Sequence, residues 1–254
     1  VLDMAVAAAA AAAGGDPGGV TVATPAGLTD LLLDQSATLL AKAERFQRIA
    51  EERHDRHGMI SGCDMPGFGD LSSCQTRDDD NNGLWTSLMT VAMYMKHAVT
   101  GVAGDADAAS RWFDGMVLLN NVTGKRGLMG RSCCAPDTFN KTCAKGTWIH
   151  DNEKWHPSAN KDYEGWWWKG DTSSDEVVGH MFAMSVVSWL SPKPEERALA
   201  RSLLLDIVGG IVDHDFELID VTGNATTWGR WAPQYVNAYR GFSDERGLQS
   251  LQIL

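Results

Sequence analysis

The sequence predicts an all-α fold in which an outer layer of helices wraps an inner layer. Three observations carry this prediction. Apolar residues recur at helical spacing in six long segments, and charge-rich segments alternate with charge-poor ones along the chain. Short and long connections alternate as well, so every long loop is expected at the same end of the helical bundle. Because loops this long are usually functional, we expect the site at that end.

The expected helices follow this order in detail. They span residues 28–53, 84–100, 105–120, 173–189, 194–214, and 243 to the end of the printed sequence. The first and fifth are amphipathic, which suits an outer layer, whereas the second and fourth are almost uncharged and are expected to be buried on most sides. Residues 1–27 are rich in Ala and Gly and indicate a low-complexity segment or linker, which leaves residues 28–254 as the domain.

Composition excludes two classes of partner. The chain has 254 residues, of which 44% are hydrophobic, so it can build a sizeable core. With 33 acidic and 22 basic residues it lacks the clustered Lys and Arg that nucleic-acid binding requires. Outside the Ala-rich start, no uncharged apolar stretch is long enough to predict a membrane span. Ten tryptophans are an unusually large number for a soluble domain.

The cysteines and glycosylation sequons indicate a secreted or extracellular protein. Five cysteines lie in expected loops, and none has the spacing of a zinc or redox motif. Sequons also fall in expected loops, at Asn121, Asn140 and Asn224. We expect one disulfide between Cys63 and Cys74, and a second between Cys143 and either Cys133 or Cys134.

A first polar cluster precedes the second helix, in the string RDDDNNGLW. Asp78, Asp80 and Asn82, followed by Gly83, match the opening of a calcium-binding loop, in which alternate oxygens converge on the ion. The match ends there, because Met89 stands where an EF-hand has its bidentate Glu. Two readings stay open: a Ca²⁺ site closed by other ligands, or an acidic turn that caps the helix N-terminus.

A second cluster precedes the fourth helix and holds the candidate catalytic residues. These are Asp171, Asp175, Glu176 and His180. They follow three consecutive tryptophans, and a carboxylate pair beside an aromatic wall is what glycosidic chemistry needs. The structural alternative is a capping box, since Ser173 and Glu176 fit the S-x-x-E pattern. Glu176 and His180, one helical turn apart, are a weaker candidate pair of metal ligands.

Aromatic residues are also concentrated at the end of the bundle where the long loops are expected. A third cluster, in the string TTWGRW, contributes residues that can stack on and hydrogen-bond a sugar. The candidate substrate-binding residues are Trp85, Trp166, Trp167, Trp168, Trp228, Arg230, Trp231 and Tyr235. Trp112 and Trp189 fall within helices and are expected in the core. The alternative for the third cluster is a loop pinned by buried indoles.

These motifs resemble a known superfamily. The strings RDDDNNGLWT, KGDTSSDEVVGH, TTWGRW and SDERGLQSLQ are similar to those of largely uncharacterised secreted proteins of the (α/α)-toroid type. That superfamily includes six-hairpin glycosidases and polysaccharide lyases, and its fold also resembles the alternation of helices over residues 28–254. A complete toroid has about twice the helices expected here. The resemblance therefore implies an incomplete toroid, completed by a missing C-terminal half or by a partner chain.

The leading functional hypothesis is a glycoside hydrolase-like domain that acts on a polysaccharide through a carboxylate pair, with tryptophans as sugar platforms and no required cofactor. The alternative is a non-catalytic extracellular domain that binds glycans or serves structure, stabilised by Ca²⁺. A third hypothesis is a polysaccharide lyase, with His180 or Tyr235 as the base and Arg230 neutralising the substrate carboxylate.

Overall fold

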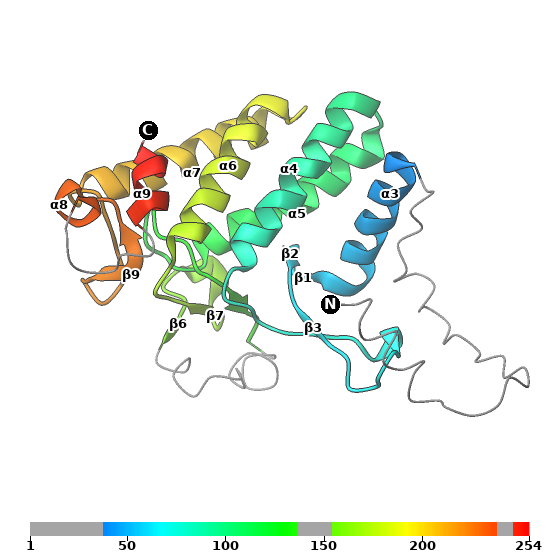
Figure 1. The fold of residues 1–254 in the computed structure, drawn as a ribbon, viewed down its shortest axis with the longest axis horizontal. Helices are drawn as coiled ribbons and strands as arrows, with labels where there is room; N and C mark the ends of the chain where they lie inside the picture. Colours follow the sequence, from blue (N-terminus) through cyan, green and yellow to red (C-terminus); the bar gives the residue numbers. More distant parts are fainter. Residues whose placement is uncertain (1–37, 137–153, 238–245, 254) are drawn as a thin grey trace, which may run out of the picture. The chain divides into compact units, whose positions relative to one another are not determined.

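The structure of the protein is a computed structural model that describes residues 38–136, 154–237 and 246–253 (Figure 1). The described residues divide into two compact units. The smaller one contains the segment Met65–Ser73, and the larger one contains residues 38–64 and the described residues from Cys74 onward. The expected low-complexity segment lies outside the described residues, as do residues 28–37 of the first expected helix.

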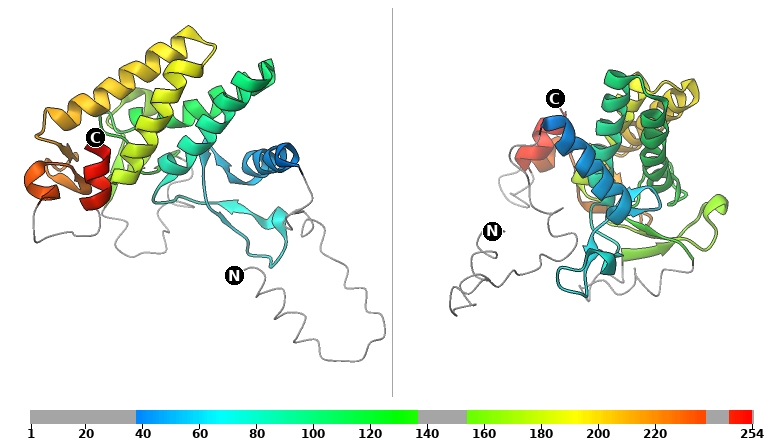
Figure 2. Two further views of the ribbon diagram at one scale, coloured as in Figure 1. Left: turned by 45° about the horizontal axis from the view of Figure 1, so that its top comes forward. Right: turned by 90° about the vertical axis from the view of Figure 1, so that its right-hand side faces the viewer.

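The larger unit is mostly helical. Its α-helices are α3 (Leu39–Ile49), α4 (Asn82–Thr100), α5 (Ala103–Asn121), α6 (Ser174–Leu190), α7 (Pro194–Val212), α8 (Pro233–Val236) and α9 (Arg246–Ile253). Helices α4 and α5 form one hairpin, α6 and α7 form a second, and α4 packs directly along α6 (Figures 1 and 2). The central pair is therefore α4 and α6, with α5 and α7 each packed on its hairpin partner.

The helices begin and end at residues suited to those positions. The side chain of Ser173 accepts a hydrogen bond from the Glu176 amide and caps α6, as the sequence predicts. Helix α4 ends at Gly101, whose φ of 66° is left-handed and is adopted readily by glycine. Pro194 opens α7, where its missing amide hydrogen is not needed. Helix α3 continues into a π-helical turn, Ala50–His54.

Small antiparallel sheets join the helices, so the prediction of a purely α-helical fold was incomplete. The paired strands are β1 (Asp55–Arg56) with β2 (Met59–Ile60), β3 (Cys63–Asp64) with β4 (Gln75–Thr76), and β8 (Glu217–Ile219) with β9 (Ala225–Arg230). A three-stranded sheet has the order β5 (Cys133–Cys134), β7 (Trp167–Lys169), β6 (Trp155–Pro157). The strings WWWK and TTWGRW, which were expected to be loops, thus lie in β7 and β9 except for Trp166 and Trp231. Backbone pairing with distant segments decides this, and local periodicity does not reveal it.

Two apolar clusters form the core of the larger unit. One lies beneath the small sheets and contains Met59, Leu119, Trp168 and Ile207. The other lies between the two hairpins and contains Trp112, Phe113 and Met184, among others. Trp112 is fully buried, as predicted.

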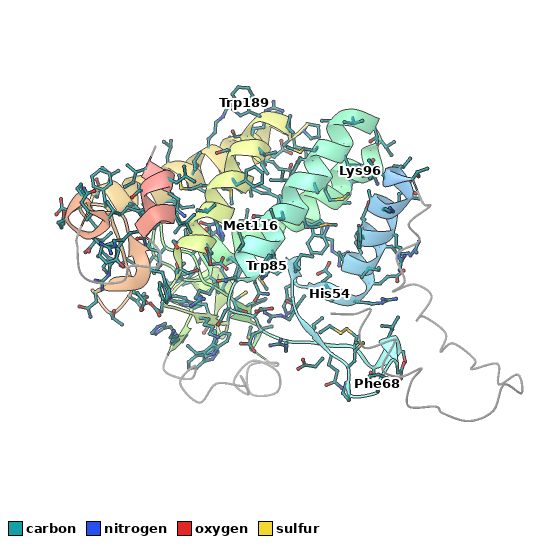
Figure 3. All side chains as sticks on the ribbon, viewed as in Figure 1. His54, Phe68, Trp85, Lys96, Met116 and Trp189 are labelled. Atoms are coloured by element: carbon teal, nitrogen blue, oxygen red, sulfur yellow. A yellow bond between two sulfur atoms is a disulfide. The ribbon has the colours of Figure 1, made fainter. Side chains whose placement is uncertain are left out.

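The central helices are less buried than their composition predicts. Trp189, expected in the core, is 84% exposed near the end of α6, so that prediction was wrong (Figure 3). One stripe of α4, which includes Trp85 and Met95, is also exposed. The expectation of burial on most sides fails because α4 packs mainly on α5 and α6, and α6 mainly on α4 and α7, which leaves one stripe of each helix exposed.

The disulfide predicted between Cys63 and Cys74 is present. Of the two alternatives for a second bridge, Cys134 is disulfide-bonded and Cys133 is a buried free thiol. Cys143 and the sequon residue Asn140 lie outside the described residues. None of the described helices combines the length and apolar character needed to cross a membrane.

Candidate functional site

The loops that lead into α4 and α6 meet, and Arg131 joins them. Its Nε donates a hydrogen bond to the backbone oxygen of Asp80 at 2.7 Å, and its Nη2 donates to Asn81 Oδ1 at 3.2 Å. Its Nη1 lies 3.4 Å from the backbone oxygen of Asp171. Ser173 Oγ donates to the same Asn81 oxygen at 3.2 Å. The first and second clusters of the sequence therefore form one polar site at the N-terminal ends of the central helices.

A buried lysine occupies the acidic loop that was predicted to bind calcium. Lys169 Nζ lies 2.6 Å from Asp80 Oδ1 and 4.0 Å from Asp78 Oδ2, and the Lys169 side chain is almost fully buried. Burial acts to raise the pKa of Asp80, but the Lys169 hydrogen bond and the Arg131 charge outweigh it, so this pKa lies below its usual value. The Lys169 ammonium thus supplies the positive charge that Ca²⁺ would bring.

Asn82, the third predicted calcium ligand, already has partners for its side chain. Its Oδ1 accepts hydrogen bonds from Arg56 Nη2 at 3.3 Å and from the Asp79 amide at 3.2 Å. Its Nδ2 donates to the Ile60 carbonyl at 2.7 Å. Within the described parts of the chain, no group of three or more His, Cys, Asp or Glu side chains is arranged to hold a metal ion. A calcium site here would have to displace both Arg56 and Lys169.

Asp171 is held in its ionised form. Its Oδ1 accepts a hydrogen bond from the Thr227 amide at 2.7 Å, and its Oδ2 accepts from Thr227 Oγ1 at 3.1 Å and from Lys154 Nζ at 3.0 Å. Burial acts to raise its pKa, but these donors together outweigh burial, and the pKa of Asp171 lies below its usual value. Its backbone has a φ of 53°, an uncommon conformation for a residue other than glycine. The Asp171 amide donates to Asp220 Oδ2 at 2.9 Å and fixes this turn.

Asp175 differs from Asp171 in having no such partners. It lies in the first turn of α6 and is half-buried. Among the described residues, its carboxylate forms neither a hydrogen bond nor an ion pair. A carboxyl group at the surface without a fixed partner is free to exchange a proton with a bound substrate.

Glu176, by contrast, is fully buried between the central helices. Its Oε1 lies 3.5 Å from the Leu84 amide at the start of α4, while its Oε2 has no hydrogen-bond partner in the described structure. Burial raises the pKa of Glu176 well above the usual value, against the Arg131 charge and the amides of Leu84 and Gly83. The predicted capping box is therefore only half formed. Ser173 caps α6, but the Glu176 carboxylate reaches across to the N-terminus of α4.

The close approach of α4 and α6 depends on two glycines. A Cβ atom on Gly83 would lie on top of Glu176 Oε2 and 2.5 Å from His180 Cε1. A Cβ atom on Gly179 would lie 2.8 Å from Leu84 Cα. Any larger side chain at either position would push the helices apart. We call Gly83, Glu176, Gly179 and His180 the helix crossing.

His180 is fully buried in the helix crossing. Its Nδ1 lies 2.9 Å from the Glu176 carbonyl oxygen and 3.9 Å from Glu176 Oε2. Burial lowers its pKa to about 4, although the carbonyls of Glu176 and Met116 act in the opposite direction. The ring is therefore neutral near pH 7. Solvent and substrate do not reach Glu176 or His180, so neither side chain is placed to react or to bind a metal together with its partner.

The predicted sugar platforms separate into buried and accessible residues. Trp168 is fully buried in the core, and Trp231 is nearly so. Trp166 and Trp167 are half-buried, with Trp166 packed edge-on against His57 and Tyr163. Trp85 is 46% exposed at the start of α4 (Figure 3). Trp228 is half-buried on β9. Of the predicted platforms, Trp85 is thus the exposed one, and Trp166, Trp167 and Trp228 are half-buried.

The third cluster brings Arg230 and Tyr235 together. Arg230 Cζ lies 5.9 Å from the centre of the Tyr235 ring, and Arg230 Nε donates to the Thr226 carbonyl at 3.2 Å. The Tyr235 hydroxyl is buried and has no hydrogen-bond partner in the described structure. A cation beside an unpartnered phenol is a chemically unusual arrangement, because buried hydroxyls are normally hydrogen-bonded.

Sequence reasoning did not identify the cations that organise this site, Arg131, Lys154 and Lys169. Arg131 lies far from both clusters in the sequence. Lys169 is a single charged residue after three consecutive tryptophans, and nothing in the sequence links it to the acidic loop. The sequence offered one signal, a lysine directly after a tryptophan on a short strand, where neighbouring side chains point to opposite faces. This signal is misleading here, because Trp168 and Lys169 are both buried. No family model, no curated protein and no solved structure matches this chain.

Proposed function

We propose that this protein is a carbohydrate-active domain of the incomplete (α/α)-toroid type, and that it hydrolyses a polysaccharide at the N-terminal ends of α4 and α6. The observation that supports this most is the contrast between two carboxylates near the start of α6, Asp171 in the preceding turn and Asp175 in the first turn of the helix. Asp171 is held ionised by Thr227 and Lys154, whereas Asp175 has no hydrogen-bond or ion-pair partner in the part of the chain that the structure describes. Two carboxyl groups close to aromatic residues are the groups that glycosidic hydrolysis requires.

The roles follow from these environments. Asp175 is the proton donor to the glycosidic oxygen, because a group that gives up a proton and regains it cannot be locked in an ion pair. Asp171 is the base or nucleophile, because a low pKa keeps it ionised at neutral pH. Trp85 and Trp228 provide stacking surfaces for sugar rings on either side. Two hairpins with a central helix pair, and loops gathered at one end of that pair, support the toroid assignment.

Product release from a panel of neutral and acidic polysaccharides tests this function. We expect the wild type to release reducing ends, and Asp175→Asn and Asp171→Asn each to lose about 100-fold or more in kcat. Asp213→Asn, on an exposed side chain at the end of α7, is the matched control and should retain full activity. A wild type that binds a glycan but releases no product from any polymer supports the non-catalytic alternative and contradicts the proposal.

One observation favours a second candidate, a polysaccharide lyase. The Tyr235 hydroxyl has no partner and Arg230 lies beside its ring. In a lyase, Arg230 would neutralise a uronate carboxylate while the ionised Tyr235 oxygen, which binding would have to expose because it is buried here, takes the C5 proton. The C4–O4 bond then breaks, a C4=C5 double bond forms, and the leaving O4 takes up a proton from water. The two reactions differ in product, since elimination gives a conjugated sugar that absorbs ultraviolet light and hydrolysis does not. Loss of such absorbance in Tyr235→Phe alone would favour the lyase.

A further inference from the structure

The central helices present a continuous bare apolar face, which we call the α4/α6 face. On α4 the exposed side chains Trp85, Leu88, Met95 and Val99 recur every three, four or seven residues, and so share one side of the helix. On α6, Val178, Phe182 and Trp189 do the same. Trp85 and Trp189 lie towards opposite ends of this face in Figure 3.

The area of this face is close to that of a dimer interface. Trp85, Phe182 and Trp189 expose 46, 42 and 84% of their surface, which at about 200 Å² for an aromatic side chain leaves about 350 Å² in water. Leu88, Met95 and Val99 expose 50, 47 and 87% and add a comparable area. Monomers rarely expose apolar patches this large, and stable interfaces bury about 800 Å² per partner.

The face carries little charge, although the chain has a net charge of −11. Lys96, the one charged residue of α4, binds Gln47 of α3 and Asp105 of α5 and is thereby directed away from the exposed stripe. On α6 the one acidic residue in register with Val178 and Phe182 is Asp175, in the first turn at the end of the face. A surface with so few charges on so acidic a chain can contact its own copy, because like charges need not be brought together except at that end.

The same face offers both projecting side chains and a depression that can receive them. A groove of about 550 Å³ lies between α6, α7 and the end of α9, and its walls include Phe182, Val208 and Ile253. Trp189 and Trp85 project from the neighbouring part of the face. A two-fold contact requires this combination, because each surface must supply both the projection and the pocket for its copy.

We propose that the α4/α6 face binds a second copy of this chain, which forms a symmetric dimer with the central helices and the groove between α6 and α7 at the contact and the outer helix α5 away from it. The proposal does not depend on the carbohydrate reaction. In the dimer, each copy supplies the helical layer that an incomplete toroid lacks on its open side. The polar site at the N-terminal ends of α4 and α6 lies at one end of this face and shares Trp85 with it, so the dimer and a sugar ring would compete for this side chain.

Sedimentation equilibrium and light scattering of the full chain test the dimer. The wild type should have the mass of two chains, and Met95→Glu and Phe182→Glu should each give a monomer with an unchanged circular dichroism spectrum. Leu199→Glu is the matched control, because Leu199 is 39% exposed and lies on another side of α7 from the groove residues Val208 and Val212. This variant should remain dimeric. A monomeric wild type at every concentration would overturn the proposal, as would a dimer that persists in both α4/α6 variants.

Discussion

The helix crossing and the surface carboxylates show how differently two neighbouring acidic groups can be used. Glu176 and Asp175 are adjacent in the sequence and both lie in the first turn of α6. Glu176 points into the contact with α4, is fully buried and has one oxygen without a partner. Asp175 is half-buried and remains accessible. Two carboxylates that are adjacent in the sequence therefore have different roles, one structural and one available for chemistry, because they lie on different faces of the helix.

The acidic groups in the loops and Glu176 in the helix crossing differ because only the former lie beside cations. At the surface end of the site, cations accompany the acidic groups: Lys169 binds Asp80, and Lys154 binds Asp171. Inside the helix crossing no cation touches Glu176, and burial keeps its proton on at pH values where the surface carboxylates are ionised. The following predictions test this contrast, in order of decreasing effect.

Removing the buried cation should have the largest effect on stability. We expect Lys169→Met to lower the free energy of unfolding by about 3–5 kcal/mol, because Asp78 and Asp80 lose their buried partner. Lys154→Met, which removes the half-exposed partner of Asp171, should cost about 1 kcal/mol or less. Urea unfolding measures both. Equal losses for the two variants would contradict the distinction between buried and surface cations.

A methyl group in the helix crossing should be the next most damaging change. Gly83→Ala places a Cβ against Glu176 and His180 and should cost about 3 kcal/mol. Gly209→Ala, in the middle of α7 with open space around it, is the control and should instead stabilise the protein by about 0.5–1 kcal/mol. A tolerated Gly83→Ala would show that α4 and α6 do not approach each other as closely as described.

The pH dependence of stability should reveal His180. Because its pKa in the folded protein is about 4 and its ordinary value is 6.5, the unfolded chain takes up a proton first as the pH falls. About 3 kcal/mol of unfolding free energy should therefore be present above pH 6.5 and lost as the pH falls towards 4. His180→Gln should lack this loss, whereas His214→Gln, on an exposed side chain, should keep it. Identical pH profiles for the wild type and His180→Gln would contradict the burial of this ring.

Glu176 should act with the opposite sign. Its raised pKa means that the folded protein holds the proton more tightly than the unfolded chain, so its contribution is full at low pH and is lost as the pH rises. The stability of Glu176→Gln relative to the wild type should therefore increase from acidic to neutral pH. Unfolding measured at several pH values shows the direction, and a decrease over the same range is the contrary result.

Calcium removal should have a small effect. Since Lys169 supplies the positive charge in the acidic loop, we expect a chelator to shift the melting temperature by about 1 °C or less, which corresponds to a fraction of 1 kcal/mol. A shift of many degrees that Ca²⁺ reverses would support the calcium-stabilised alternative and show that Lys169 is displaced when the ion binds.

The sequence predicted the helices well and the partners of their side chains poorly. The bounds of α4 and α6 followed from periodicity, Gly101 and the Ser173 cap, which are local signals. Strand β9 was missed because its pairing with β8 depends on contacts outside the string itself. The exposure of Trp189 was missed because the sequence of an uncharged helix does not show whether all of its sides are covered by other residues or one is exposed to solvent. The role of Glu176 could not be predicted, since its partner Gly83 belongs to another helix.

The most direct test of the central claim compares the activities of Glu176→Gln and Asp175→Asn on a polysaccharide that the wild type cleaves. If Glu176 belongs to the helix crossing and Asp175 to the reaction, Glu176→Gln should keep kcat within about threefold, which is less than 1 kcal/mol in barrier height. Asp175→Asn should lose most of its activity while remaining folded. A folded Glu176→Gln protein without activity, beside an active Asp175→Asn protein, would contradict the account.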